Sequence, residues 1–547
     1  MSLRRISIST LSPVHVGCDE VYEPSNFVIT DGLLHALDPA DLAADLSEAE
    51  RKQLATLAEG REPVGALQRF FRDNATRFVG IACHQVAVAE AIMREYEKSL
   101  GKPTQRGTAG EATYNLFPIA RTAYRPLDNV PYLPGSSLKG SIRTAWLNHC
   151  NGGKPLTGDE QRDKRGGAPR HLQERLLGYA PGRFENDPFR HIGLADAHPE
   201  EDGTPPPTRV LYAISKKKRQ PREGESGSPE LKVFLETVPD ALPAVFLGEL
   251  RIGEQERGAK IDWNSLCDAC NAFYKPQLEA ELNHAVLGNL IAADWKALIN
   301  ALLAGELSEL ITARQGFLLR VGRHSGAESV TLDGVRDIKI LGPRIDGKQT
   351  SEYRSNTTEK RFASLTKAGA NELLPFGWLW VDACDDAHRH LSDALCQKLA
   401  ARSAPLYAAH QERLLQLDDA KQQRAIAAAE AERQRQAAED TARAEAEAKA
   451  VRQAALAALS PNSRRVEEFI AAFSARAEQL RGGRENLNGV FHGLARDLAR
   501  NALEDSGWTS VEKCAAADAI AEWLPKVVEK IDKDQIKKLK LSALRAQ

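Results

Sequence analysis

The sequence predicts a mixed α+β protein that continues into a long helix and an all-helical C-terminal domain. Three observations predict this class: strand-like runs bounded by Gly and Pro, helical segments between those runs, and a change of composition near residue 386. A chain of 547 residues with 42% hydrophobic side chains can form roughly three or four parts with cores of their own. The expected parts are an α+β unit at 1–198, a second α+β unit at 199–390, a charged helical linker at 391–460 and a helical bundle at 461–547.

The first unit opens with a strand pattern at residues 4–17, where apolar and polar residues alternate until a proline and a glycine end the run. Residues 26–37 form two apolar runs around Asp31 and Gly32, and Asp-Gly is a strong hairpin signal. The segment 63–99 looks helical. A strand, a hairpin and helices within a hundred residues predict a ferredoxin-like (RRM-like) unit.

The second unit has the same kinds of elements in a similar order, although no tight sequence repeat is visible. Strands are expected at 209–215, 231–238, 244–252, 316–321 and 378–381, with mostly helical sequence from 262 to 313. We therefore expect a second ferredoxin-like (RRM-like) unit.

The C-terminal part is helical throughout. Residues 410–458 are dominated by Ala, Glu, Gln, Arg and Lys, a composition that favours one long helix. Ser460 and Pro461 end it and start another helix, because Ser is a good N-cap and Pro is tolerated in the first turn. The remaining sequence predicts a small bundle that ends in a basic helix at 530–540.

Composition narrows the function classes. The formal net charge is -2, whereas a protein that coats naked duplex DNA usually has a basic excess, so any nucleic-acid contact is expected in a local basic groove. Arg4 and Arg5 lead straight into the first strand pattern instead of a signal peptide, and no run approaches the ~20 apolar residues of a membrane span. Eight scattered cysteines fit reduced thiols, so we expect a cytoplasmic protein.

The segment 134–143, PGSSLKGSIR, is a glycine-rich loop that enters a basic helix. Gly135 and Gly140 let the backbone approach a ligand, and the unsatisfied N–H groups of a helix N-terminus attract phosphate. Lys139 and Arg143 are four residues apart and share a helix face. The spacing differs from the P-loop pattern, so no nucleotide triphosphate site is predicted. A plain helix start with surface cations explains the segment equally well on physical grounds.

A second glycine-rich segment, GFLLRVGRHSG, occupies residues 316–326. A strand delivers a turn that contains Arg323, His324 and Ser325, and successive N–H groups in such turns form anion-binding nests. The alternative is an ordinary turn with exposed polar residues. The two segments together point to anion binding more strongly than either does alone.

The strand LSPVHVG, the motif YLPGSSLKGSIRTAW, the turn FLLRVGRHSG and the closing LLPFGWLWV resemble the repeat-associated mysterious protein (RAMP) superfamily of CRISPR systems. Their order and spacing most resemble the family of the fifth Csm subunit of type III-A effector complexes. The resemblance covers roughly residues 1–390, and 391–547 exceeds what that family usually has. It implies a subunit that binds guide RNA, contacts the neighbouring backbone RAMP subunit, caps the filament at the guide 3′ end and supports guide maturation.

The resemblance also implies site residues, position by position. Those that would line or approach the RNA path are His15, Gly135, Ser136, Ser137, Lys139, Arg143, Arg320, Gly322, Arg323, His324, Ser325 and Gly326. Further candidates lie in a basic stretch before the last strand, namely Thr358, Lys360 and Arg361. No cofactor is expected, and the CxxC formed by Cys267 and Cys270 is a weak metal signal because no second pair accompanies it.

Two other functions stay open. His15 could act as a general base in a guide-processing endoribonuclease of the same superfamily, since histidine titrates near neutral pH; the alternative is that it packs in its turn or stacks on a base. His324 could be a second histidine, but nothing in the sequence brings the two together. The other possibility is an RNA-binding adaptor outside CRISPR. A further hypothesis is that the C-terminal bundle mimics the small helical subunit that lines these complexes. The small helical subunit and target RNA are also possible partners of the chain.

Overall fold

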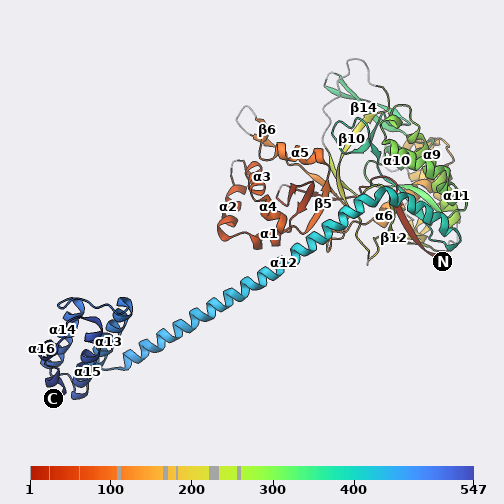
Figure 1. The fold of residues 1–547 in the computed structure, drawn as a ribbon. Coiled ribbons are helices and arrows are strands. Elements are labelled where there is room, and N and C mark those ends of the chain that lie inside the picture. Colours follow the sequence, from red (N-terminus) through yellow and green to blue (C-terminus); the bar gives the residue numbers. More distant parts are fainter. Residues whose placement is uncertain are drawn as a thin grey trace. The chain divides into compact units, whose positions relative to one another are not determined.

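The computed structural model describes residues 2–23, 25–60, 62–106, 112–163, 170–179, 183–201, 203–220, 233–254, 260–345 and 347–546 (Figure 1). The chain divides into two compact units, Met1–Lys421 and Gln422–Gln547. We call them the body and the C-terminal unit. Each has a hydrophobic core of its own.

An antiparallel five-stranded sheet forms the centre of the body. Its strands, in spatial order, are β13 (Gly316–Arg320), β18 (Trp378–Asp382), β1 (Ser2–Thr10), β12 (Leu242–Ile252) and β9 (Ile192–Leu194). β1 pairs with β12 on one edge and with β18 on the other. The division expected at residues 198 and 199 therefore does not separate the sheets, because a strand from the first part lies between two strands from the second.

The second, larger sheet has both parallel and antiparallel strand pairs. Its order is β2 (Gly17–Tyr22), β8 (Ile119–Thr122), β11 (Phe234–Thr237), β10 (Arg209–Lys217), β5 (His84–Val88), β4 (Leu33–Ala36) and β3 (Phe27–Thr30), with β16 (Glu359–Ser364) on β10 and β17 (Leu374–Pro375) on β16. The predicted hairpin is confirmed: β3 and β4 pair antiparallel around Asp31 and Gly32, both with positive φ. Two separate hairpins are β6 (Pro103–Arg106) with β7 (Ala112–Tyr114) and β14 (Ile338–Ile345) with β15 (Lys348–Arg354).

The body contains helices as well as these sheets, and α10 contacts α11, which is labelled near α9 in Figure 1. Their bounds are α1 (Pro39–Asp45), α2 (Glu48–Ala58), α3 (Pro63–Asp73), α4 (Ala75–Gly80), α5 (Glu90–Ser99), α6 (Gly135–Asn151), α7 (Gly158–Asp163), α8 (Arg170–Leu177), α9 (Trp263–Leu282), α10 (Ala293–Ala304) and α11 (Glu306–Thr312). α6 packs against α9, and both contact β13 of the five-stranded sheet. The expectation of helix throughout 63–99 was wrong, because β5 interrupts it and pairs with β4 and β10.

The long helix α12 spans Arg389–Ala458. Its start differs from the expected linker, because Leu395 and Leu399 are buried in the core of the body and Arg402 forms ion pairs with Asp240, at 2.7 Å, and with Asp294. Residues up to 421 thus belong to the body, not to a linker. The charge-rich composition hid this, because the few apolar residues that anchor the helix are widely spaced.

The C-terminal unit is helical, as the sequence predicts, and its described residues form five helices after α12. They are α13 (Pro461–Leu480), α14 (Val490–Glu504), α15 (Ser510–Val527), α16 (Lys533–Lys538) and α17 (Leu541–Arg545). The predicted cap at Ser460 is confirmed, because its side chain accepts a hydrogen bond from the Ser463 N–H and Pro461 occupies the first turn. Among the described residues, no helix is long and apolar enough to cross a membrane.

Candidate nucleic-acid interface

The start of α6 is the first predicted anion site. The Gly135 N–H donates to Asp196 Oδ1 at 2.7 Å, and a Cβ added to Gly135 would lie 2.3 Å from the carbonyl oxygen of Leu194. Gly135 therefore serves the packing of α6 against the end of β9, and its N–H is already used. Ser136 is exposed, and a Cβ added to Gly140 would meet nothing within 4 Å. The open backbone on this face of α6 is thus at Gly140.

The two predicted cations of α6 differ in their surroundings. Arg143 forms an ion pair with Asp187 at 2.9 Å, donates to Gln173 at 3.4 Å and lies over the ring of Phe189. Lys139 makes no ion pair within the described part of the chain; burial and nearby Arg143 lower its pKa, while Asp187 raises it. Lys139 is therefore the cation available to a ligand, whereas Arg143 is anchored.

The turn at 322–326 lies directly against the loop that contains His15. A Cβ added to Gly322, which has a φ of +81°, would lie 2.3 Å from the His15 carbonyl oxygen, and that oxygen accepts a hydrogen bond from the Arg323 N–H at 2.8 Å. Ser325 Oγ donates to the Gly322 carbonyl at 2.9 Å, and Gly326 also has a positive φ. The structure thus brings His15 and this turn together, and the close approach requires Gly322.

His15 and His324 are neighbours with unpartnered imidazole nitrogens. His15 is buried and its Nδ1 lies 2.7 Å from the Glu236 carbonyl oxygen, so Nδ1 carries the proton because a carbonyl only accepts. Nε2 of each ring is buried without a hydrogen-bond partner. Burial lowers the pKa of His15, and burial together with Arg361, Arg323 and His15 lowers the pKa of His324 to about 3. Both rings are neutral at physiological pH.

Arg320 and Lys360 converge on one buried carboxylate. Glu281 Oε2 lies 3.1 Å from Arg320 Nη1, 2.8 Å from Lys360 Nζ and 3.1 Å from Trp378 Nε1. Burial, with Arg320 adding to it, lowers the pKa of Lys360 to about 8, and the two cations lower the pKa of Glu281 against the effect of its burial. Arg320 is only 2% exposed and also donates to the Phe376 carbonyl, so its side chain lies in the interior of the body.

The remaining predicted residues lie nearby or are structural. Arg361 is half-buried and donates to the Ala213 carbonyl at 3.5 Å, while the Thr358 carbonyl accepts from the Lys218 N–H. Cys267 and Cys270 are buried in α9, where burial raises the pKa of both thiols. The described residues contain no group of three or more His, Cys, Asp or Glu side chains that could hold a metal ion.

Sequence reasoning missed the carboxylates that hold these cations. Asp187 follows a short 3-10 helix 44 positions after Arg143, and Glu281 lies 39 positions before Arg320. The only sequence signal for Glu281 is a charged residue on the apolar face of a predicted helix, where an unpaired charge would be costly. Such a position predicts a buried partner but does not identify it.

Comparison with known proteins gives a family match over most of the body. The sequence model of the RAMP superfamily matches residues 7–399. The Csm5 protein of a CRISPR system in Methanocaldococcus jannaschii is 22% identical over 145 residues, which are 26% of this chain. That match spans only 30% of the relative's own length.

Two solved structures are also similar. A chain in the cryo-EM structure of a Csm–crRNA–target RNA ternary complex in a type III-A CRISPR-Cas system is 17% identical, with a TM-score of 0.44, and the similarity covers 70% of this chain and 100% of that one. The crystal structure of T. onnurineus Csm5 is 16% identical, with a TM-score of 0.40 and coverage of 69% and 99%.

Proposed function

Because the chain belongs to the RAMP superfamily, we propose that it is a non-catalytic guide-RNA-binding subunit of a type III-A CRISPR effector complex. In this role it contacts the neighbouring backbone RAMP subunit, caps the backbone filament at the guide 3′ end, and supports guide maturation and assembly in the cytoplasm. The small helical subunit and target RNA are further partners of the chain in this proposal, and the C-terminal unit, which lies beyond the matched residues, mimics the small helical subunit.

One observation carries the RNA-binding part of the proposal. The exposed Ser136, the open backbone at Gly140 and the unpaired Lys139 lie on the first turns of α6, where the partial positive charge of the helix N-terminus adds to the charge of the lysine. Phosphate is the ligand that such a surface prefers, and it is the repeating group of any RNA strand. Contacts of this kind position a strand without reading its sequence.

The experiment is a salt titration of guide-RNA binding by the full chain and its Lys139→Gln variant. Loss of one phosphate contact should lower affinity for RNA of any sequence and reduce the slope of log K against log salt by about 1. Lys102→Gln removes the same charge from an exposed position elsewhere in the body and serves as the control. An unchanged slope for Lys139→Gln, or an equal effect of both variants, would refute the phosphate contact.

The second candidate function is a guide-processing endoribonuclease. The neighbouring, neutral His15 and His324 favour it, because a free Nε2 lone pair is the form that a general base needs. Their burial argues against it, since neither ring reaches solvent freely. Abolished cleavage of a guide precursor by purified His15→Ala protein, with active wild type, would favour this function over the first.

A further inference from the structure

A cavity of about 410 Å³ adjoins the Glu281 ion cluster. We call it the Glu281 cavity; it is bounded by α9, the end of β13, β16 and the loop that follows η4 (Ala327–Val330). Its lining includes Gln277, Glu281, His284, Arg320, Arg336 and Lys360. This volume is within the range of ~300–1,000 Å³ typical of small-ligand pockets.

Two buried polar atoms of the cavity lining have no hydrogen-bond partner. They are Oε1 of Glu281 and Nη2 of Arg320, an acceptor and a donor. The other halves of the same two groups, Oε2 and Nη1, are 3.1 Å apart, so the free atoms belong to one ion pair. An unsatisfied buried polar atom costs ~1–3 kcal/mol, and more when it is charged, so the site favours a ligand that supplies both a donor and an acceptor.

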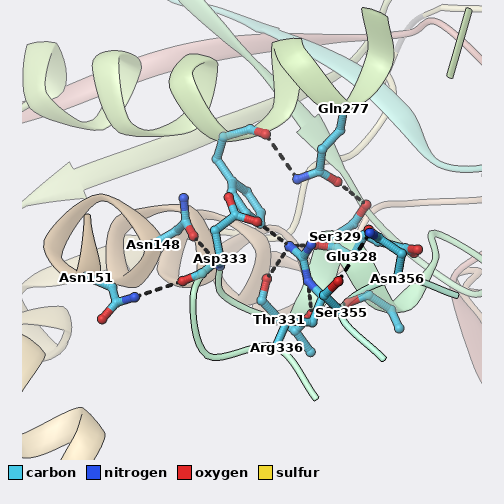
Figure 2. Close-up of polar contacts among 12 residues, drawn as sticks. Asn148, Asn151, Gln277, Glu328, Ser329, Thr331, Asp333, Arg336, Ser355 and Asn356 are labelled. Atoms are coloured by element: carbon cyan, nitrogen blue, oxygen red, sulfur yellow. Dashed lines mark hydrogen bonds and ion pairs between the residues drawn. The ribbon is translucent and has the colours of Figure 1, made fainter. Parts of the chain in front are cut away.

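The wall opposite α9 is held rigidly by hydrogen bonds, which Figure 2 shows. The Arg336 guanidinium donates hydrogen bonds to Asp333 at 2.8 Å and to the Glu328 carbonyl at 3.1 Å (Figure 2). Ser329 donates to Gln277 on α9 at 2.9 Å (Figure 2). Asn148 accepts from the Asp333 N–H, so the same loop is tied to α6 (Figure 2). This wall of the cavity is thus tied both to α9 and to α6, the helix on which the phosphate contact is proposed.

We propose that the Glu281 cavity receives one unstacked nucleobase of the bound RNA strand, an inference that rests on the proposed function. The edge of every nucleobase carries an N–H donor next to a carbonyl or ring-nitrogen acceptor. Both atoms are buried, so a small rotation of the two side chains must accompany entry of the base; Glu281 Oε1 then accepts from the N–H, and Arg320 Nη2 donates to the neighbouring acceptor. Because all four bases offer such a pair, the cavity can hold a base of a strand whose sequence varies.

A third group of the cavity supports this assignment. His284 Nδ1 accepts from the N–H groups of Val286 and Leu287, both at 3.2 Å, so its proton resides on Nε2 as a further donor. A phosphodiester of the RNA backbone fits less well, because it offers only acceptors, would leave Glu281 Oε1 unsatisfied and carries a negative charge that the Glu281 carboxylate repels. A base supplies the missing donor without adding a negative charge.

The test uses the full chain with guide RNAs that carry a single 4-thiouridine at successive positions. Ultraviolet cross-links are mapped by mass spectrometry, with one RNA position expected to react with peptides that contain Gln277, Glu281 or Lys360. Ala280→Trp fills the exposed mouth of the cavity from α9, whereas Ala272→Trp adds the same bulk at an exposed position of α9 that does not line the cavity. The yield of that cross-link should fall about tenfold or more in Ala280→Trp and stay within about twofold in Ala272→Trp. A tenfold fall corresponds to a loss of ~1.4 kcal/mol in the free energy of base binding.

Several outcomes would overturn the inference. If the wild-type protein retains RNA but gives no cross-link to these peptides, no base occupies the Glu281 cavity. If the cross-link survives in Ala280→Trp, the base lies outside this cavity. Thermal stabilisation of RNA-free protein by uridine monophosphate, without any RNA cross-link, would assign the cavity to free nucleotides. If wild-type protein binds no RNA at all, the proposed function itself fails. The wild-type cross-link decides the matter even if a variant does not fold.

Discussion

Replacing Glu281 by Gln should destabilise the body strongly, because this carboxylate is the shared counter-ion of Arg320 and Lys360. The variant keeps the shape and a carbonyl acceptor but leaves two buried positive charges without a negative partner. Breaking a buried ion pair costs ~3–5 kcal/mol, and the retained acceptor places this variant near the lower end, at ~3 kcal/mol. Glu279→Gln on the same helix is the control: its 3.7 Å pair with Lys275 is half-exposed and contributes ~0.5 kcal/mol or less.

The assay is urea denaturation followed by tryptophan fluorescence, since Trp295, Trp378 and Trp380 are buried in the same core. A second substitution, Lys360→Met in the Glu281→Gln background, removes one stranded charge and should restore more than ~1 kcal/mol. The penalty should also shrink as pH rises above neutral. The pKa of Lys360 is already lowered to about 8, so the folded variant releases this proton before the unfolded chain does, and its stability then increases with pH.

Three results would refute this reasoning. They are a cost below ~1 kcal/mol for Glu281→Gln, an equal cost for Glu279→Gln, and no rescue by Lys360→Met. Any of them would mean that the cluster is solvated or that its cations find other partners.

Two further predictions concern the glycines of α6 and the histidine of the turn. Gly140→Ala should stabilise the body by ~0.5–1 kcal/mol in thermal denaturation, because the added Cβ is unobstructed, yet it should weaken RNA binding in a filter assay. Gly135→Ala should destabilise the body, because the added Cβ clashes with the Leu194 carbonyl. Stronger RNA binding by Gly140→Ala would contradict the proposed backbone approach. The pKa of His324 is about 3 in the folded protein and near 6.5 in the unfolded chain, so the unfolded chain binds more protons between these pH values. The free energy of unfolding of the wild type should therefore fall as pH drops below ~6.5, by up to ~1.4 kcal/mol per pH unit. His324→Phe should lack this pH-dependent loss of stability, which denaturation of both proteins at pH 7 and pH 5 measures. If the wild type and the variant lose equal stability between pH 7 and pH 5, His324 is not the cause.

Local signals predicted local structure well. The Asp31-Gly32 hairpin and the Ser460 cap are confirmed because the deciding interactions lie within a few residues of each other. The start of α12 was misjudged because its anchors, Leu395, Leu399 and Arg402, contact residues far away in sequence. The alternation of apolar and polar residues likewise indicates which face of a strand is buried, but it does not identify the strand that pairs with it.

The candidate site was predictable as a set of residue types but not as a set of environments. The sequence indicates that Arg143 and Arg320 are cations near glycine-rich loops, yet both are held by carboxylates that only the fold brings close. His15 and the turn at 322–326 were expected near one path, and the hydrogen bond from Arg323 to the His15 carbonyl joins them directly. Which of these groups touch RNA stays a prediction.

The central place of β1 has a consequence for synthesis of the protein on the ribosome. Ile8 pairs with Phe246 on one side and with Val381 on the other. At translation rates of ~5–20 residues per second, the second partner emerges roughly 20–75 s after Ile8 does. During that time one edge of the strand lacks its hydrogen-bonding partner, and nascent chains that end before β18 cannot complete the sheet. The late closing strand therefore leaves an early strand edge open to pairing with other chains while the body is being made.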